Sequence, residues 1–543
     1  MKVLILGGVA AGTKVAAKLK RENRDFQVTV VTKSKDISYA GCGLPYYVGD
    51  VIQDKAQLIV NTPQKFSNLT GAEVITQTEA VSLNPETKTV HAVHLADGTE
   101  EDYTYDKLVI ATGAEPVKPA IEGIDLPGVY YMRTPADAIA VKEAVEAGTI
   151  KRAVVVGGGF IGLEMAENLQ KQGVRATVIE MMPHILPMYD DEICEYLENH
   201  LADQGIMTFT GDRLVSILGD GKVEKIKTEK RAMKADAVIM SVGIRPCTQW
   251  LEGTGLDMVK GTIKVNEYLE TNLPDVYAVG DCACVMNHLT HQDAWSPMGS
   301  SANMEGRLAA RNIAGGHYAY QGVLGTAVIK LPKINAGRTG LTEKDAKAKG
   351  YDPISVITVV DDKAHYYPGA GIFIVKMIAD RNTEKLLGLQ VLGAGAVDKM
   401  VDIAVTAITL GATLSQLEDM DLAYAPPFST AIHPFAHTLN VLRNKLLGRF
   451  ETFTPAEYQA GAAEDYKVLD VSLAPSVPGA PYLDLVDING PVDGFGLDEK
   501  ILLVCNRGKR AYLTQNRLKY YGYTNTKVLE GGTIFNTQIT EEQ

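Results

Sequence analysis

Short apolar runs, glycine turns and amphipathic helices follow one another along most of the chain. The first run, Val3–Leu6, leads into a glycine turn and then a helical stretch with Val15, Ala16 and Leu19 on one face. This order predicts a βαβ unit of the dinucleotide-binding kind, in which glycines let the backbone approach a pyrophosphate at the helix N-terminus. The candidate cofactor contacts in this turn are Gly7, Gly8, Ala11 and Gly12.

This first turn departs from the full G-x-G-x-x-G pattern, because Val9 stands at the second glycine position. The next strand, Gln27–Val31, is followed by Thr32 and Lys33, where an acid that holds a ribose is usual. Taken alone, the turn fits either a cofactor site or an ordinary strand-to-helix connection. Lys33 is kept as a candidate cofactor contact.

Two later segments favour FAD at this site. Lys107–Gly113 reads as a buried strand with a tight turn at Thr112 and Gly113, and Asp275–Asp281 reads as a strand ending at Gly280 and Asp281. In two-dinucleotide flavoproteins such segments close the FAD domain, and the last carboxylate binds the ribityl chain. The three segments together predict an FAD site.

A second glycine turn matches G-x-G-x-x-G in full. It follows the strand Ala153–Val156, opens a helix over Ile161–Gln172, and precedes a strand that ends in Glu180. A carboxylate at this spacing binds the 2′-hydroxyl of NAD and repels a 2′-phosphate, so NADH is favoured over NADPH. Candidate contacts are Gly157, Gly159, Phe160, Ile161, Gly162, Glu164 and Glu180, with Gly243 in the return crossing to the FAD domain.

The second half of the chain predicts two further regions. From about Gly325 to Gly448 strands alternate with helices, one of which carries an apolar face from Val397 to Ile408, so an α+β module is expected. Residues 451–464, rich in alanine and glycine, predict a linker. A small last domain then begins with a strand over Lys467–Val471.

Length and composition limit the possible classes of protein. A chain of 543 residues predicts several domains, and a net charge of −13 disfavours binding to nucleic acid. No apolar run reaches the roughly 18 residues of a transmembrane helix, so a cytoplasmic protein is expected. No cysteine and histidine pattern predicts a metal site. Of six cysteines, four are expected to be buried small residues: Cys194, Cys247, Cys282 and Cys284.

Cys42 lies in a glycine-rich segment, ISYAGCGLPYYVGD, after the first βαβ unit, where the ring of FAD would be reached. Tyr47 stands five residues on, where two-cysteine reductases have their second thiol. The oxidised form is therefore a mixed disulfide, a persulfide or a sulfenic acid. Reactivity requires the thiolate, and lowering its pKa by two units needs about 2.7 kcal/mol. A helix N-terminus, the flavin and a tyrosine hydroxyl are the expected sources.

Residues 7–448 resemble the pyridine nucleotide–disulfide oxidoreductases with a single active-site cysteine, in the branch of the coenzyme A-disulfide/persulfide reductases. The resemblance lies in SYAGCGLPYY (Ser38–Tyr47), YYPGA (Tyr366–Ala370) and YAPPFS (Tyr424–Ser429). It implies an α/β fold with two Rossmann-like domains, an α+β dimerisation domain and a small α/β rhodanese-like domain. The expected ranges are 1–113 and 242–322 for FAD, 114–241 for NAD(H), 323–450 for dimerisation, 451–464 for the linker and 465–543 for the last domain.

The resemblance also implies how the site is completed. A homodimer is expected, in which one subunit brings Tyr366 or Tyr367, and Tyr424, towards the other's Cys42. The implied reaction is NADH-driven reduction of coenzyme A disulfide, coenzyme A persulfide or polysulfide. Coenzyme A, as substrate or bound thiol, is expected at Thr13, Lys18, Ser38, Asn303 and Arg307.

Departures from that branch leave alternatives open. An NADH oxidase or peroxidase that cycles Cys42 through sulfenic acid is one, although peroxidase relatives have a His in the first glycine turn, where Ala10 and Ala11 stand here. A non-catalytic flavoprotein sensor is another. His433, followed by Pro434, is either a catalytic residue or an ordinary hydrogen-bonding histidine.

The tail resembles a shortened rhodanese. The loop from Cys505 to Arg510 keeps the pattern C-x-x-G-x-R, and its backbone N–H groups, Arg507 and Arg510 are expected to hold a thiolate or persulfide. Ser472 stands where an arginine is usual, so a purely structural tail is the alternative. If active, Cys505 would pass sulfane sulfur to a coenzyme A thiol and so to Cys42.

Overall fold

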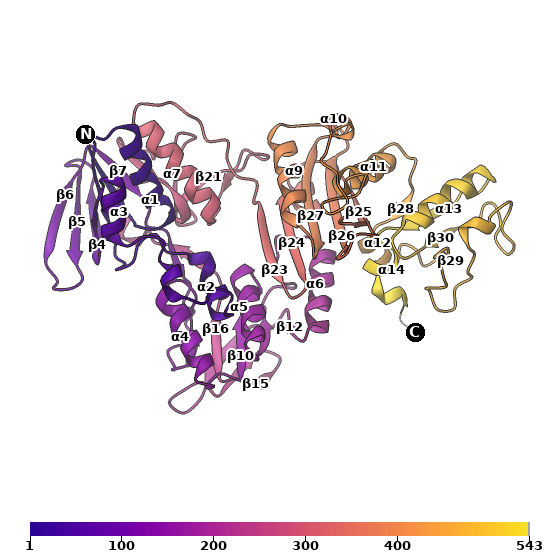
Figure 1. The fold of residues 1–543 in the computed structure, drawn as a ribbon, viewed down its shortest axis with the longest axis horizontal. Coiled ribbons are helices and arrows are strands. Elements are labelled where there is room, and N and C mark those ends of the chain that lie inside the picture. Colours follow the sequence, from indigo (N-terminus) through magenta and orange to yellow (C-terminus); the bar gives the residue numbers. More distant parts are fainter. Residues whose placement is uncertain (541–543) are drawn as a thin grey trace. The chain divides into compact units, whose positions relative to one another are not determined.

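The computed structural model of the chain describes residues 1–540 (Figure 1), so the last three residues of the predicted tail domain lie outside the described part. Its contacts divide the chain into two compact units. The first contains residues 1–186 and 201–323, and the second contains 187–200 and the chain from 324 onward.

A parallel sheet of order β20-β7-β1-β2-β3 organises the N-terminal half of the first unit. All of these strands except the edge strand β3 are largely buried. They are β1 (Lys2–Leu6), β2 (Gln27–Val31), β3 (Glu73–Ile75), β7 (Lys107–Ile110) and β20 (Val276–Ala278). Helices α1 (Ala10–Glu22) and α7 (Gly299–Ile313) pack against each other, and α3 (Pro63–Thr70) packs on α1.

A second parallel sheet, of order β12-β11-β10-β16-β9, repeats this design. Its strands are β9 (Val129–Tyr130), β10 (Arg152–Val156), β11 (Arg175–Ile179), β12 (Met207–Phe209) and β16 (Ala237–Met240). The helices associated with it are α2 (Leu44–Val48), α4 (Pro135–Glu146) and α5 (Phe160–Lys171). The two parallel sheets confirm the expected pair of dinucleotide folds.

Smaller antiparallel sheets complete the first unit. One contains β4 (Thr78–Asn84), β5 (Thr89–His94) and β6 (Glu100–Thr104), and another contains β13 (Leu214–Leu218), β14 (Lys225–Thr228) and β15 (Ala232–Lys234). The crossing between the two halves is a pair, β8 (Ala114–Pro116) with β17 (Ile244–Pro246). The remaining strands are β18 (Met258–Val259), β19 (Thr262–Lys264), β21 (Ala283–Met286) and β22 (Asp293–Ala294).

The second unit is built on an antiparallel sheet of order β23-β24-β27-β26-β25. Its strands are β23 (Ala327–Leu331), β24 (Ile334–Gly340), β25 (Pro353–Asp361), β26 (Ile372–Asp380) and β27 (Leu386–Gly393). The helices of this module are α8 (Glu343–Ala348), α9 (Val397–Thr409), α10 (Leu414–Glu418) and α11 (Pro434–Leu446). This is the expected α+β module.

Residues 187–200, which contain most of α6 (Asp191–Asp203), belong to this second unit although the sequence places them in the NAD(H) domain. The reason is a buried ionic cluster. Lys376 of β26 is 2% exposed and lies 2.5 Å from Glu192 and 3.2 Å from Asp190. These carboxylates compensate the buried ammonium group and hold the segment on the sheet.

The tail forms a parallel sheet of order β28-β31-β30-β29. Its elements are β28 (Thr452–Phe453), α12 (Pro455–Gln459), β29 (Lys467–Asp470), β30 (Ile501–Val504), α13 (Lys509–Tyr520), β31 (Thr526–Leu529) and α14 (Gly532–Phe535). The prediction that residues 451–464 form a linker is therefore wrong, because this segment contains the strand β28 and the helix α12. Thr454 and Glu457 form a capping box at the start of α12, with Pro455 at the first helical position.

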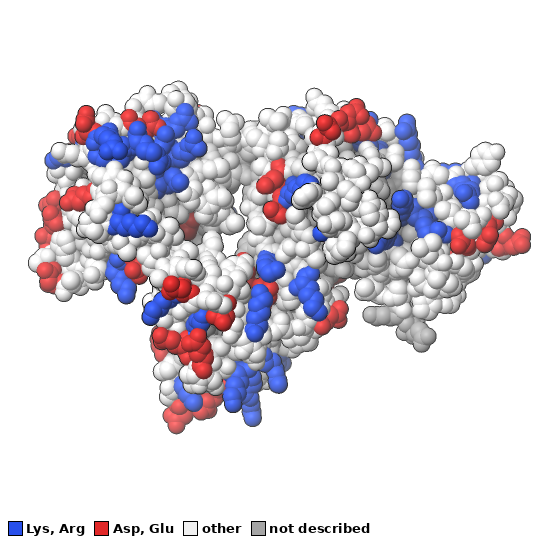
Figure 2. Space-filling model, in the orientation of Figure 1, with Lys and Arg blue, Asp and Glu red and all other residues white. Residues whose placement is uncertain are grey.

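Short 3₁₀ segments in the described part of the chain are η1 (Gly41–Gly43), η2 (Lys55–Leu58), η3 (Gln249–Leu251), η4 (Gly280–Cys282), η5 (Leu485–Asp487) and η6 (Thr537–Thr540). Among residues 1–540, no helix combines the length and the apolar character needed to cross a membrane. Basic and acidic side chains are intermixed on the face drawn in Figure 2.

Candidate functional site

The first glycine turn, between β1 and α1, is shaped by close backbone contacts. Gly7 has φ +118°, and a Cβ there would lie 2.0 Å from the carbonyl oxygen of Ala111, which follows β7. A Cβ on Gly12 would lie 1.9 Å from the oxygen of Gly7. No side chain caps α1, so its first N–H groups point to a site open to an anion. The turn fits the pyrophosphate of FAD.

The second glycine turn, between β10 and α5, has the same contacts. Gly157 has φ +109°, a Cβ there would lie 2.2 Å from the oxygen of Ser241, and one on Gly162 would lie 2.0 Å from the oxygen of Gly157. At the middle glycine, Gly159, no heavy atom lies within 4 Å of an added Cβ. That open space explains why Val9 is tolerated at the corresponding place in the first turn.

Glu180 is fixed at the end of β11. Its carboxylate accepts hydrogen bonds from the N–H groups of Gly158 and Met182, both at 2.7 Å, and its side chain is buried. Each carboxylate oxygen keeps a further lone pair for a ribose hydroxyl. Phe160 and Ile161 form the first turn of α5, as expected. The second turn therefore fits NAD(H).

The predicted FAD contacts gather at one edge of the first sheet, because the carboxyl ends of β1, β7 and β20 meet there. Thr112 donates to the carbonyl oxygen of Cys247 at 2.8 Å, and Gly113 follows it in a left-handed turn at φ +70°. The N–H of Gly280 donates to Glu305 at 2.6 Å. Gly243 lies in the return crossing, at φ +104°.

Two charged candidates at this edge are already paired. Asp281 lies 3.2 Å from Arg133, and Lys33 lies 2.7 Å from Glu79. No local pattern points to Arg133, which is 148 residues from its partner. Glu305 was also missed, and its burial raises its pKa to about 7.

Cys42 lies on η1, immediately before α2, and is exposed. Partial desolvation raises the pKa of its thiol, the carboxylates of Glu164 and Asp281 raise it further, and Arg133 opposes them. Among the side chains that act on the thiol, only Arg133 lowers its pKa, so the expected lowering stays a prediction that depends on the bound flavin and a helix N-terminus. The sequence did not reveal that Glu164 and Asp281 act on this thiol.

Tyr46 and Glu164 form a polar pair beside Cys42. The Tyr46 hydroxyl donates to Oε1 of Glu164 at 2.9 Å. Burial raises the pKa of Glu164 to about 7, although the hydrogen bond from Tyr46 lowers it. Tyr46 was not singled out from the sequence. Its position four residues after Cys42, one helical turn away, is the signal that would have found it.

The predicted coenzyme A contacts lie on or near the packed pair α1 and α7. A Cβ on Gly306 would lie 2.7 Å from the oxygen of Ala11, so these helices approach closely. Several candidates already have partners within the unit. The Thr13 hydroxyl donates to the carbonyl of Val9, Lys18 pairs with Glu22, Asn303 donates to Gly299, and the Ser38 N–H donates to Gly8, while Arg307 is exposed.

The candidate tyrosines lie in the second unit. Tyr366 and Tyr367 follow β25, and they and Tyr424 are exposed. A hydrogen bond with Tyr366 raises the pKa of Tyr424, so these two hydroxyls are brought together.

His433 is the N-cap of α11. Its Nδ1 accepts the N–H of Phe435 at 3.2 Å, and burial lowers its pKa to about 4. It also lines a small cavity of about 150 Å³ with Phe373, Met400 and Phe428. A neutral, hydrogen-bonded cap favours the non-catalytic alternative for this histidine.

Cys505 is 2% exposed, at the start of the loop between β30 and α13. The N–H groups of Gly508 and Ala511 donate to its Sγ at 3.2 and 3.4 Å. The expected backbone cradle is present, but the arginines do not contribute to it as expected. Arg507 lies 2.7 Å from Asp361, and Arg510 lies 2.6 Å from Asp484, because acidic partners distant in sequence hold both side chains.

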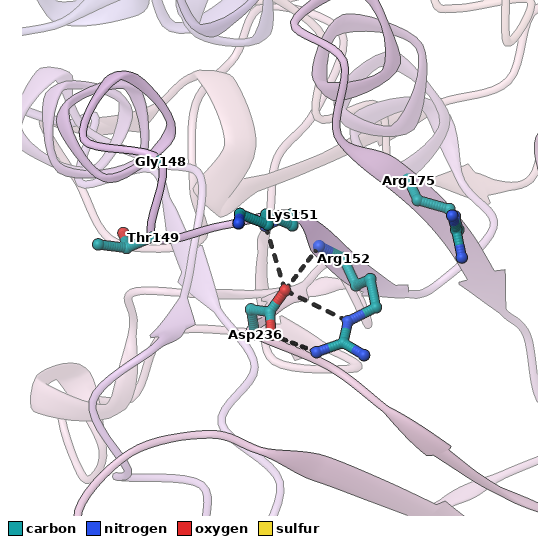
Figure 3. A pocket seen from close by; sticks show the side chains of 6 residues that line it. All are labelled: Gly148, Thr149, Lys151, Arg152, Arg175 and Asp236. Atoms are coloured by element: carbon teal, nitrogen blue, oxygen red, sulfur yellow. Dashed lines mark hydrogen bonds and ion pairs between the residues drawn. The ribbon is translucent and has the colours of Figure 1, made fainter.

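A wide depression of about 530 Å³ lies elsewhere on the second parallel sheet (Figure 3). It is lined by Thr149, Lys151, Arg152, Arg175 and Asp236, and Arg152 and Asp236 bond to each other at 2.8 Å. These residues stand at the starts of β10, β11 and β16, whereas dinucleotides bind at the carboxyl ends of such strands. The depression is therefore separate from the glycine turn.

Comparison with known proteins gives a consistent result. Residues 1–301 match the pyridine nucleotide-disulphide oxidoreductase family, and residues 326–436 match the dimerisation domain of that family. The chain is 36% identical to the NAD(P)H sulfur oxidoreductase (CoA-dependent) of Pyrococcus furiosus, over 81% of this chain and 99% of that protein. It is 34% identical to the NADH oxidase of Methanocaldococcus jannaschii, over 80% and 97%.

The tail is covered by a solved structure. The NAD-dependent persulfide reductase of A. fulgidus is 36% identical, with a TM-score of 0.93, and the match covers 98% of this chain and all of that one. Both glycine turns, the fold and these matches agree. The chain therefore belongs to the pyridine nucleotide-disulphide oxidoreductase family and is an oxidoreductase whose cofactors are FAD and NAD(H).

Proposed function

We propose that this protein is an NADH-driven reductase of coenzyme A disulfide, coenzyme A persulfide or polysulfide. The observation that carries the proposal is one exposed thiol, Cys42, on a segment tied to both glycine turns. Ser38 on that segment donates its N–H to Gly8 at 2.9 Å, and Tyr46 donates to Glu164 at 2.9 Å. The names of the P. furiosus and A. fulgidus relatives support a sulfur acceptor.

The residues of the two turns have distinct tasks in this proposal. Bound FAD would supply two-electron chemistry between NADH and a sulfur group. Gly157, Gly159 and Gly162 hold the NADH pyrophosphate at the start of α5, and Glu180 binds a ribose hydroxyl. Gly7 and Gly12 hold the FAD pyrophosphate in the same manner.

Cys42 carries the sulfur chemistry. Its thiolate attacks one sulfur of the acceptor, a bond from Cys42 to that sulfur forms, and the leaving thiol or hydrosulfide departs with the electron pair of the broken bond. The leaving group then takes up a proton. Two electrons that originate in NADH split the mixed disulfide and restore the Cys42 thiolate. Tyr47 at the position of a second cysteine supports this route over an internal disulfide.

The proposed assembly is a homodimer in which Tyr366, Tyr367 and Tyr424 complete the site of the other subunit. The family's dimerisation domain at residues 326–436 supports this arrangement. Coenzyme A is proposed to lie along α1 and α7, within reach of Thr13, Lys18, Asn303 and Arg307.

The tail is proposed to be a rhodanese-like domain. Two N–H groups directed at the sulfur of Cys505 support the proposal, because such a cradle stabilises a thiolate or persulfide. Thiosulfate would transfer its outer sulfur to the Cys505 thiolate and release sulfite, and a coenzyme A thiolate would then accept that sulfur. The four domains keep their predicted ranges in this proposal: 1–113 with 242–322, 114–241, 323–450 and 465–543.

A second candidate function is an NADH oxidase, favoured by the M. jannaschii relative of that name. One experiment separates the two. Purified protein with NADH is offered coenzyme A disulfide, coenzyme A persulfide, polysulfide or oxygen, and NADH consumption is followed by absorbance. Sulfur acceptors should be reduced much faster than oxygen, and oxygen as the fastest acceptor would overturn the proposal.

A further inference from the structure

The segment that carries Cys42 and the helix that opens the NAD(H) turn are packed tightly together. Helix α2 contacts α5, and a Cβ on Gly49 would lie 2.0 Å from Oδ1 of Asn168. Asn168 is fully buried, and its Nδ2 donates to the carbonyl of Glu164 at 2.8 Å. Only glycine at position 49 permits this approach, which fixes Glu164 relative to the cysteine segment.

One polar contact crosses this packing. The Tyr46 hydroxyl donates to Glu164 at 2.9 Å, and Tyr46 stands one helical turn after Cys42 because η1 runs directly into α2. Charge on Glu164 raises the pKa of Cys42, and charge on Cys42 raises the pKa of Tyr46. The charge states of the three groups therefore influence one another.

Burial and the negative charge of Glu167 keep the pKa of Glu164 above its usual range. Glu167, buried on the same helix, adds to the raised pKa of Glu164 and is itself paired with Lys171 at 2.9 Å. Arg133 and Asp281 act on Cys42 with opposite signs. A carboxyl with a pKa of about 7 is protonated in roughly half of the molecules at neutral pH.

We propose that Glu164 holds a proton for the Cys42 reaction and delivers it through the Tyr46 hydroxyl. The inference rests on the proposed function, in which one NADH and one further proton convert a disulfide into two thiols. For this step the hydrogen bond between the two side chains reverses: protonated Glu164 donates to the Tyr46 oxygen, which frees the Tyr46 hydroxyl to turn to the leaving thiolate. When that thiolate departs with its electron pair, Tyr46 donates its hydroxyl proton to it and takes the proton of Glu164. The Glu164 carboxylate then reloads from water, so charge and protons balance.

The same arrangement controls the thiol. While Glu164 keeps its proton, it carries no negative charge, so it does not raise the pKa of Cys42. Once the proton is delivered, the negative charge on Glu164 disfavours a second negative charge on Cys42. Proton delivery and thiolate formation are therefore linked through one carboxyl group.

The test measures Cys42 itself in the reduced holoenzyme. Iodoacetamide labelling of the Cys42 peptide is followed by mass spectrometry from pH 5 to 10 in the wild type, Glu164→Gln, Tyr46→Phe and Glu192→Gln. Glu192 is the matched control, since it is also a buried carboxyl whose pKa is raised by burial, but it pairs with Lys376 in the second unit. Flavin content per chain verifies that each variant is folded.

In Glu164→Gln the labelling midpoint should fall by about one pH unit. Labelling should be only about twofold faster at pH 7, where half of the wild type already has a neutral Glu164, and up to about tenfold faster at higher pH, where the wild-type carboxyl is ionised. Turnover with coenzyme A disulfide should nevertheless fall about tenfold or more in both Glu164→Gln and Tyr46→Phe. Faster labelling with slower turnover is a combination that damage to the site does not produce. Glu192→Gln should keep the labelling curve of the wild type.

An unshifted labelling midpoint in Glu164→Gln, or wild-type turnover in Tyr46→Phe, would overturn the inference. Failure of the proposed function has a different signature. If the wild type reduces oxygen but no sulfur acceptor, the function is wrong, and the labelling curves still decide whether Glu164 and Cys42 share a proton.

Discussion

The two loop cysteines lie in opposite surroundings. Cys42 is exposed, and the groups that act on it are titratable side chains: Glu164, Asp281 and Arg133. Cys505 is buried, and the groups that contact its sulfur are backbone N–H donors. Cys42 thus offers an accessible sulfur atom, whereas Cys505 has a sulfur atom held by backbone donors.

This difference has a chemical consequence. Backbone donors are fixed by the fold and keep their effect at every pH, which suits a thiolate or persulfide that waits for a partner. Titratable neighbours change their charge during a reaction, which suits a thiol that must alternate between nucleophile and leaving group. Within the single chain Cys42 is exposed and Cys505 is buried, so a reagent should reach Cys505 only after its loop opens.

The largest expected effect comes from removing each thiol in turn. Cys42→Ser should lower NADH turnover with sulfur acceptors by at least about a thousandfold, because the nucleophile is lost. Cys505→Ser should leave turnover with coenzyme A disulfide within about twofold but impair turnover that starts from thiosulfate. Stopped-flow absorbance should show that both variants still transfer a hydride from NADH to FAD. Equal losses of coenzyme A disulfide turnover would contradict the distinct roles.

The elements around Cys42 were predictable because their signals are local. The strand β2 has the predicted bounds, and the glycine turns at Gly7 and Gly157 lie between strand and helix as expected. An apolar strand followed by glycines leaves few other structures open to the chain. The capping box Thr454–Glu457 was also a local signal, and overlooking it produced the wrong linker.

The electrostatics of both cysteines were not predictable, because the partners are distant in sequence. Tyr46 and Glu164 are 118 residues apart, and Arg507 and Asp361 are 146 apart. The pattern C-x-x-G-x-R correctly indicated the backbone cradle, which depends on the local turn. It said nothing of the carboxylates that hold the two arginines.

The next expected effect concerns how the tail is held on its own subunit. Glu530 is buried and accepts from Lys445 at 2.6 Å, Thr452 at 2.6 Å and the N–H of Ile357 at 2.8 Å. Glu530→Ala should destabilise this docking by about 3 kcal/mol, since it leaves buried donors unpaired. Hydrogen exchange in β30 and β31 should become about a hundredfold faster, while exchange around Cys42 is unchanged.

The control for this change is Glu451→Ala. Glu451 pairs with Lys519 at 3.0 Å, and its side chain is 45% exposed, so its loss should cost less than about 1 kcal/mol. If Glu451→Ala accelerated exchange in β30 and β31 as much as Glu530→Ala does, the buried carboxylate would not be the anchor.

A smaller effect is expected when the two native thiols are labelled in one sample. At pH 9, where ionisation limits the rate less, iodoacetamide should modify Cys42 about tenfold or more faster than Cys505, because Cys505 must first be exposed by local opening. In about 8 M urea, where the protein is expected to be unfolded, the two labelling rates should converge. Mass spectrometry of the two peptides gives both rates. Faster native labelling of Cys505 would show that its loop is open in solution.

The smallest expected effect tests whether the Arg507–Asp361 ion pair keeps the Cys505 loop closed. Both side chains are partly exposed, at 41% and 29%, so the pair should contribute only about 0.2–1 kcal/mol. Arg507→Ala should therefore raise the labelling rate of Cys505 by up to about fivefold and leave that of Cys42 unchanged. Because partly exposed pairs are screened by salt, about 1 M NaCl should accelerate Cys505 labelling in the wild type but not in the variant. If neither change affects the rate, closure depends on the backbone contacts of the loop alone, and the contrast between the two cysteines is then one of chain packing rather than of charge.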